Sequence, residues 1–377
     1  MSNLVEKRST RDGAAPPAGA HSLMEIVSQS DCWSACFESL QQSGSLGQVS
    51  ASFADAEEWL FIGCGSSYYV ALCAAATMTA FTGRRARAVP ASEVLLYPEL
   101  AFGPAKNLVP VLISRSGQTS EVLKAAEWLR SQSIPTLAIS CAEGQTLETL
   151  ASLTITLPAD EKSTVMTRSF TSMLLALQNL AAHLGKKNEE AKQLSNMPGL
   201  AAATLATLPD IIRSFVAAHT FADYICLGQG PYYGLACEYA LKVTEMSVSY
   251  AQVFHTLEFR HGPKSVVNPE NLLVFLLSEK GYEAEVDLLE EMKSLGGTTL
   301  VVTNRATERV RASADLLVDL NLDVPEFLRL APSLVPGQLL GLYTGLRKGL
   351  DPDSPRNLSR AVILDNHTSK KTEHATL

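Results

Sequence analysis

Several features that would assign this chain to a particular class of protein are missing from its 377 residues. The seven cysteines are scattered and odd in number, so we expect no disulfide framework, and this favours a reducing, cytoplasmic compartment. There is no uninterrupted apolar run of about 18 residues, so we expect no transmembrane helix. The N-terminus also lacks a charged segment followed by a short apolar run, so we expect no signal peptide. The net charge of −8 argues against a nucleic-acid partner or an anionic membrane surface.

Two common nucleotide-binding motifs are also missing. Gly63 and Gly65 lack the third glycine of a dinucleotide fingerprint, and no Walker A loop occurs. Cys32 and Cys36 lie one helical turn apart, but no histidine or second cysteine pair accompanies them, which argues against a zinc site. We therefore expect no metal and no cofactor.

What the sequence does contain is a repeated pattern of strands and helices. Hydrophobic residues make up 46% and charged residues 19%, which is typical of a globular protein, and the chain is long enough for two domains. Three pairs of segments match at nearly the same offset: 59–78 with 224–243, 107–117 with 271–281, and 134–140 with 298–304. The sequence therefore predicts an α/β protein with two tandem, doubly wound parallel-sheet domains related by internal duplication.

Composition predicts where these domains begin and end. The first 21 residues are rich in small and polar side chains without periodicity, and we expect a disordered leader there. Mixed helical spacing over 22–43 predicts one or two helices. The expected organisation is a leader at 1–21, a first domain at 22–185, a polar linker at 186–199, a second domain at 200–350, and a C-terminal strap and tail at 351–377.

The two copies differ in the loops that follow their strands. In the first copy these loops carry many hydroxyl side chains, whereas the second copy has few at the matching places. Hydroxyls and backbone N–H groups at helix N-termini can hold a phosphate monoester at the carboxyl edge of a parallel sheet, although Ser and Thr can also simply cap helices. Three such loops in one copy favour the anion site. The candidate ligands are Ser66, Ser67, Ser114, Ser116, Gln118, Thr119 and Thr164.

An ionisable stripe is predicted in the second copy. Glu238, Lys242 and Glu245 stand at i, i+4 and i+7, so a helix over 234–250 projects all three from one face. Such a stripe is either a solvated face with weak salt links or a site for general acid–base catalysis. The following run EFRHGP favours catalysis, because it presents His261 from a turn. Proton transfer between adjacent carbons of an open-chain sugar phosphate requires such groups.

The chain contains, in this order, GCGSSYY, ISRSGQTSEV, TRSFTSM, EYALKVTEMS, FRHGPKS and DSPRNLSR. From about residue 24 to 364 it resembles a tandem pair of sugar isomerase (SIS) domains, which have a flavodoxin-like fold. The resemblance is closest to the isomerase half of glucosamine-6-phosphate synthase and to the galactosamine/tagatose-6-phosphate ketose–aldose isomerase (deaminase) proteins.

The resemblance implies a role for each group of residues. The phosphate would be held by Ser67, Ser114, Ser116 and Thr119, with Ser66 adjacent. Glu245 falls at the enolisation base, Lys242 and Glu238 at polar partners, and His261 at the ring-opening histidine. In the synthase that histidine reaches in from a neighbouring subunit, so the resemblance also implies a homodimer.

Three positions depart from the synthase pattern. Arg360 stands where the synthase has a lysine that forms an imine with the sugar, and a guanidinium stays protonated and cannot form one. Arg115 replaces a glutamine and Gln118 a glutamate. Arg115 either adds a charge-assisted phosphate contact or is simply solvated. With neither a preceding glutaminase domain nor a terminal Cys nucleophile expected, glutamine-dependent amination is improbable.

The sequence therefore predicts a metal-independent phosphosugar aldose–ketose isomerase that acts on an amino-sugar 6-phosphate and releases ammonia. Two alternatives remain at this point. One is a deglycase that releases an amine from a fructosamine 6-phosphate by similar proton chemistry. The other is a sugar-phosphate sensor on the same fold without turnover, against which the joint presence of Glu245, Lys242 and His261 argues.

Overall fold

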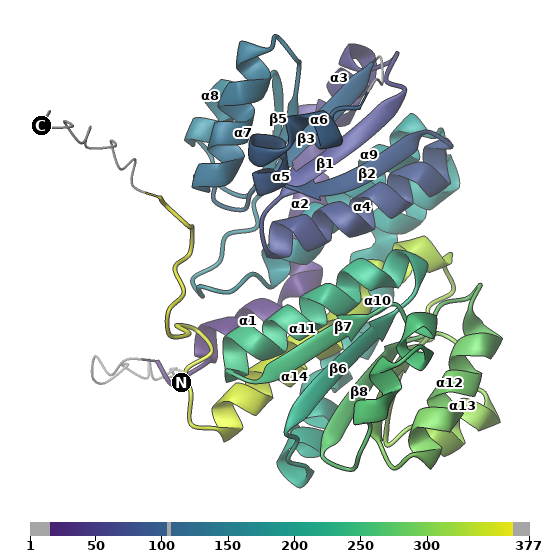
Figure 1. Ribbon diagram of the computed structural model, residues 1–377. Helices are drawn as coiled ribbons and strands as arrows, with labels where there is room; N and C mark the ends of the chain where they lie inside the picture. The colour runs from purple at the N-terminus through teal and green to yellow at the C-terminus, as the bar shows by residue number, and fades with distance from the viewer. Residues whose placement is uncertain (1–15, 104–106, 365–377) are drawn as a thin grey trace, which may run out of the picture.

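A computed structural model describes residues 16–103 and 107–364 and confirms two parallel sheets of five strands each (Figure 1). The sheet orders are β2-β1-β3-β4-β5 and β10-β9-β8-β6-β7, which is the same connectivity in both copies. The first sheet comprises β1 (Glu58–Gly63), β2 (Arg85–Pro90), β3 (Leu108–Ile113), β4 (Leu137–Ser140) and β5 (Leu153–Thr156). The second comprises β6 (Asp223–Gly228), β7 (Tyr250–Phe254), β8 (Asn271–Leu276), β9 (Thr298–Thr303) and β10 (Leu316–Asp319). The predicted duplication therefore extends to the topology.

The central strands lie in the segments that match between the two copies in the sequence. β1 and β8 are buried along their whole length, as expected for parallel strands covered on both faces. The outer strands β2 and β7 are only partly buried and lack a continuous apolar run. Apolar patterning therefore finds the middle of each sheet and misses its edges.

Helices flank both sheets and also lie between them (Figure 1). In the first half these are α1 (Ala20–Val27), α2 (Gln29–Ser43), α3 (Ser45–Ser52), α4 (Ser66–Thr82), α5 (Ala91–Leu96), α6 (Pro98–Ala101), α7 (Ser120–Ser131), α8 (Thr146–Leu150) and α9 (Arg168–Leu184). In the second they are α10 (Asn188–Ala218), α11 (Tyr233–Ser247), α12 (Tyr282–Ser294), α13 (Glu308–Ser313) and α14 (Leu330–Arg347). Short 3₁₀ turns are η1 (Gly230–Tyr232), η2 (Leu257–Arg260), η3 (Pro263–Val266) and η4 (Glu326–Arg329).

The two copies share one hydrophobic core, which fixes the position of α11. Helices α4 and α11, one from each copy, pack against each other, with α9 behind α4 and α14 behind α11. A single cluster of buried side chains runs from Trp33 and Phe61 through Tyr239 to Leu339. Helix α14 lies close to α11 because Gly341 has no side chain, since a Cβ there would stand 2.6 Å from the backbone oxygen of Lys242. Helix α14 therefore packs closely against the helix that carries the stripe residues and fixes its position.

The structure differs from the sequence-based expectation between the two copies. The helix that spans the predicted start of the second domain at residue 200 begins already at Asn188, so most of the predicted linker 186–199 is the polar first part of α10. Acidic residues in the first turn favour this earlier start. By length and composition α10 is the one helix of the described chain that could cross a membrane. It packs against α2, α9 and α14, and buries one apolar face that includes Leu205 and Ile212.

The C-terminal strap runs back across the first copy after α14 (Figure 1). Residues 351–364 contain no regular helix or strand. The backbone oxygen of Val362 accepts a hydrogen bond from the amide of Ser120 at the start of α7, and that of Asp353 accepts one from Thr164. Most of the predicted leader (1–15) and the polar tail (365–377) lie outside the described residues.

Candidate functional site

A cavity of about 190 Å³ lies at the carboxyl edge of the first sheet. Its walls come from the loops after β1 and β3, from residues 164–166, from Glu245 of the second copy, and from 358–362 of the strap. After β1 the chain adds β2 on one side of it and then β3 on the other, so the switch point of the sheet lies between β1 and β3. Doubly wound sheets bind ligands at this point. A larger cavity of about 540 Å³ lies near the amino-terminal ends of the same strands and holds none of the predicted site residues.

The predicted stripe on α11 is a buried charge cluster. The Nζ of Lys242 lies 3.2 Å from Oε1 of Glu238 and 2.5 Å from Oε2 of Glu245. The side chains of Lys242 and Glu238 are fully buried, and that of Glu245 is 19% exposed. The solvated-face interpretation is therefore wrong. Glu245 is the member of the stripe that lines the cavity.

Ser66 connects this stripe to the first copy. Its hydroxyl donates to Oε1 of Glu238 at 3.0 Å and accepts from Lys242 at 3.4 Å. Ser66 opens α4, and the turn before it is tight because Gly63 lets the chain fold back: a Cβ at Gly63 would lie 2.6 Å from the carbonyl of Ser67. The fold thus brings the hydroxyl loops of one copy onto the acid–base stripe of the other.

Burial and neighbouring charges shift the pKa values of the stripe residues in opposite directions. Desolvation raises the pKa of Glu238 to about 7, although Lys242 lowers it, and Oε2 of Glu238 is buried without a hydrogen-bond partner among the described residues. For Lys242, burial by itself lowers the pKa, but Glu238 and Glu245 together outweigh this effect and raise it. Lys242 is therefore a fixed positive charge beside Glu245.

Stability should depend on pH through Glu238. Because its pKa is raised from 4.5 to about 7, the folded protein keeps a proton that the unfolded chain releases between these values. This contribution, about 3 kcal/mol in full, is complete below pH 4.5 and is lost as the pH rises toward 7. Urea unfolding of Glu238→Gln should therefore show a smaller fall in stability between pH 5 and pH 7.5 than the parent does. Equal slopes would contradict this, and Glu285, whose pKa burial also raises to about 7, leaves the same background in both proteins.

Most of the candidate hydroxyl side chains lie around this cavity. Ser66, Ser67, Ser116, Thr119 and Thr164 line it. The hydroxyl of Ser114 lies just behind, 3.1 Å from that of Thr119. Gln118 does not line the cavity, because its side-chain amide turns away to Gln145 and Thr146.

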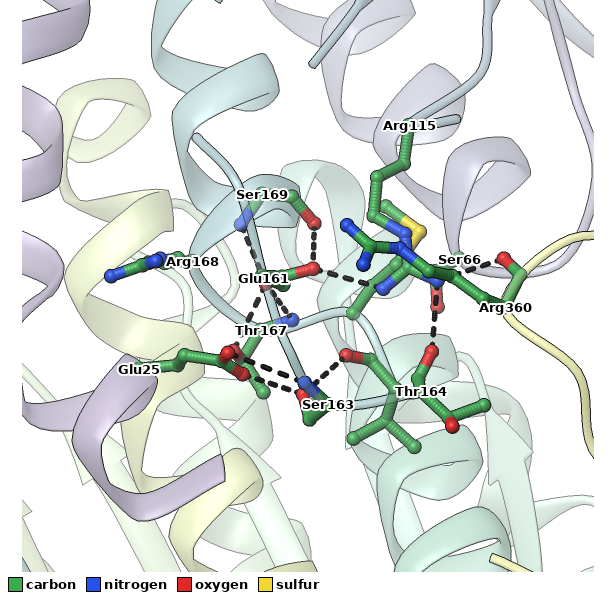
Figure 2. Close-up of polar contacts among 12 residues, drawn as sticks. Glu25, Ser66, Arg115, Glu161, Ser163, Thr164, Thr167, Arg168, Ser169 and Arg360 are labelled. Atoms are coloured by element: carbon green, nitrogen blue, oxygen red, sulfur yellow. Dashed lines mark hydrogen bonds and ion pairs between the residues drawn. The ribbon is translucent and has the colours of Figure 1, made fainter. Parts of the chain in front are cut away.

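Arg115 is neither solvated nor unpaired. Its side chain is 6% exposed, and Nη1 lies 2.9 Å from Oε2 of Glu161 (Figure 2). Its Nη2 donates at 2.8 Å to the backbone oxygens of both Thr164 and Arg360. The solvated alternative for Arg115 is therefore wrong. Arg115 also lines the cavity, and its predicted phosphate contact stays a prediction.

Two buried carboxylates that the sequence analysis did not single out hold the loop 161–169 in place (Figure 2). Glu161 accepts from the backbone amides and hydroxyls of Thr167 and Ser169 as well as from Arg115. Glu25 of α1 accepts from the amide and hydroxyl of Ser163. Neither residue belongs to a periodic pattern, so no signal in the sequence marks them.

The remaining two predicted site residues occupy different environments. Arg360 lines the cavity from the strap, and its guanidinium reaches outward to Asp160 at 2.7 Å. His261 follows η2 in the second copy, is exposed, and does not line the cavity of its own chain. Its predicted role, which the resemblance assigns across a subunit boundary, stays a prediction.

Two parallel sheets of one topology, with a hydroxyl-lined cavity at the switch point of the first, define a doubly wound α/β protein built to bind a small ligand. The model of the SIS domain family matches residues 52–183 and 224–335, which together are more than half of the chain. The chain belongs to the SIS domain family, as the sequence motifs predict.

Known relatives fit this assignment. The chain is 28% identical over 319 residues to glutamine–fructose-6-phosphate aminotransferase (isomerizing) of Helicobacter pylori, a match that covers 80% of this chain and 51% of that protein. The chain thus spans about half the length of the curated relatives that it matches. It is also similar to the solved structure of glucosamine-6-phosphate deaminase from Thermotoga maritima, with a TM-score of 0.75, 28% identity, and coverage of 92% and 100% of the two chains.

A further solved structure supports the fold alone. Tagatose-6-phosphate ketose/aldose isomerase from Escherichia coli superimposes with a TM-score of 0.81 over 94% of this chain and 99% of that one, at 23% identity. Proteins named for different sugars and different reactions thus share this architecture. The fold by itself therefore does not select a substrate.

Proposed function

We propose that the protein is a phosphosugar isomerase that converts an amino-sugar 6-phosphate to the ketose phosphate and releases ammonia. The observation that carries this proposal is that Glu245, paired with the buried Lys242, lines the same cavity as the hydroxyl loops of the other copy. A relative named as a glucosamine-6-phosphate deaminase supports the same reaction class.

The proposed reaction uses the two walls of the cavity for different tasks. Hydroxyls and N–H groups of the first copy would hold the phosphate, so that binding energy remote from the reacting carbons positions them. The carboxylate of Glu245 would take the proton from C2 of the open-chain sugar, and the C1 oxygen would gain a proton to give an enolamine. Return of the proton to C1 gives a ketose imine; water then adds at C2 and ammonia leaves.

Lys242 would serve this proton transfer by its charge. An ammonium 2.5 Å from Glu245 stabilises negative charge that develops nearby during enolisation. Arg360 cannot act in place of the synthase lysine, since a guanidinium does not form an imine with the sugar. Ring opening by His261 of a neighbouring subunit remains part of the proposal.

The size of the cavity favours an amino-sugar phosphate over a fructosamine conjugate. Its volume of about 190 Å³ lies below the roughly 300–1,000 Å³ typical of pockets for drug-sized ligands. A hexosamine phosphate is the smaller of the two substrates, whereas a fructosamine phosphate that carries an amino acid needs more room beyond C2.

The direct test is ammonia release from galactosamine 6-phosphate and glucosamine 6-phosphate, run beside fructosamine 6-phosphates with amine detection. We expect ammonia from one of the two hexosamine phosphates. Amine release from a fructosamine phosphate alone would make the protein a deglycase. No turnover of any substrate, with a sugar phosphate still raising the melting temperature, would make it a sensor.

Ser116→Ala should weaken substrate binding more than it slows the chemical step. Ser116 lines the cavity, and loss of one hydrogen bond to a charged phosphate should raise KM about tenfold or more, with kcat less affected. Ser131→Ala, at an exposed serine of α7, is the matched control. An unchanged KM in Ser116→Ala would remove this hydroxyl from the phosphate site.

A further inference from the structure

The second copy also has a cavity of its own. It has a volume of about 430 Å³ and lies at the carboxyl ends of β8 and β9. Tyr232, from the turn after β6, stands on its wall where Ser67 stands in the first copy. Each sheet therefore has a cavity at its carboxyl edge, and that of the second copy lies one strand away from the switch point between β6 and β8.

The chemistry of this second cavity differs from that of the first. The loop after β8 reads Ser278-Glu279-Lys280, where the first copy has Ser114-Arg115-Ser116. The hydroxyl of Ser278 donates to Glu285 and accepts from the amide of Gly281, so its hydrogen bonds are already made within the protein. Hydroxyls therefore do not form an anion cradle in this copy.

A buried guanidinium takes the place of the hydroxyls. Arg329, just before α14, lines the cavity and is 3% exposed. Its Nη2 pairs with Glu279, but its Nε is buried and has no hydrogen-bond partner within the part of the chain that the structure describes. Buried guanidinium N–H groups rarely stay unpaired, so the protein leaves part of the hydrogen-bonding capacity of Arg329 unused.

A second guanidinium stands at the wall of the same cavity. Arg305 follows β9, its side chain is 64% exposed, and its guanidinium carbon lies 4.5 Å above the ring of Tyr282. Stacking on an aromatic ring restrains the long side chain without using its hydrogen-bond donors. The ion pair between Arg305 and Glu283 is loose, at 3.5 Å and on the exposed side.

Each of the two arginines has one carboxylate partner, Glu279 for Arg329 and Glu283 for Arg305. Glu285 is occupied by the amide and hydroxyl of Ser278, and Glu326 accepts from the amide of Glu279. Burial raises the pKa of Glu285 to about 7 and also raises the pKa of Glu326. An incoming anion would have to compete with two exposed carboxylates, Glu279 at Arg329 and Glu283 at Arg305.

We propose that this cavity is a second ligand site, which binds a small oxyanion-bearing molecule, a phosphate ester or a carboxylate, through Arg329 and Arg305. Guanidinium groups suit both kinds of oxyanion because two N–H groups can meet two oxygens. The proposal does not depend on the reaction at the first cavity, since it concerns binding in a different copy by different residues.

The test is a calorimetric titration with inorganic phosphate and, separately, with malonate, on a Ser116→Ala/Thr119→Val protein in which the first site is weakened. We expect millimolar or tighter binding of at least one of the two anions, and the stronger one names the ligand class. Arg305→Gln should weaken that binding and Glu279→Gln should strengthen it, each by about two- to fivefold. Both residues are exposed, so these two variants should fold, whereas Arg329→Gln would remove a buried guanidinium.

We expect the two substitutions to change the affinity for the anion in opposite directions. If the arginines had only a structural role, they would not do so. Absence of binding of either anion would overturn the proposal. It would also be overturned if binding were the same in the parent, Arg305→Gln and Glu279→Gln. Ammonia release at the first cavity is unaffected by either outcome, so failure of this proposal and failure of the proposed function are separable.

Discussion

Glu245→Gln should lower kcat by about 10²–10⁴-fold, the range that a positioned general base contributes, while the sugar phosphate still binds. Glutamine keeps the shape of the side chain, and its amide oxygen can still accept the hydrogen bond from Lys242. What it loses is the ability to accept the proton from C2. Because the phosphate loops lie in the other copy, the Kd of the substrate should change little.

Two measurements separate this expectation from a general loss of structure. Ammonia release gives the turnover, and exchange of the C2 proton with deuterated solvent reports enolisation directly, before ammonia leaves. Both should fall together in Glu245→Gln, with the Kd measured by calorimetry. Glu290→Gln, at an exposed carboxylate of α12, is the matched control. Full turnover in Glu245→Gln would exclude this carboxylate as the base, and the proposed mechanism would lose its proton carrier.

How far the sequence predicts this site depends on whether the residues lie in a regular element. Glu238, Lys242 and Glu245 could be grouped from their spacing alone, because a helix puts these positions on one face. Their burial could not be predicted, because it comes from α4 of the other copy, whose Ser66 meets Glu238. Spacing defines a face, but what covers that face is a property of the tertiary structure.

Residues in loops were harder to place. Gln118 belongs to the same loop as Ser116 and Thr119, yet its amide points away toward Gln145. Loop direction depends on backbone turns that apolar periodicity does not report. The same limit explains why β2, with the sequence RARAVP, was not predicted as a strand. Its pairing with β1 and the cover given by α4 place it there, since it has no continuous apolar run of its own.

Glu161 is the clearest case of a residue with no signal in the sequence, and its replacement should have the largest effect on stability. Glu161→Ala leaves the guanidinium of Arg115 buried without its carboxylate and removes the acceptor from the amides of Thr167 and Ser169. Breaking a buried ion pair from one side typically costs about 3–5 kcal/mol. We expect a loss of this size in the free energy of unfolding, measured with urea.

The neighbouring pair Asp160–Arg360 provides the control for that measurement. It lies on the same loop and joins the same strap, but its side chains are 80% and 48% exposed, so Asp160→Ala should change stability by no more than about 1 kcal/mol. Glu161→Ala should also raise KM, because Arg115 ties the loop at Thr164 to the strap at Arg360 across the cavity. If Glu161→Ala were as stable as Asp160→Ala, the buried cluster would not hold the cavity wall, and the strap would be fixed by its other contacts, such as those with Ser120 and Thr164.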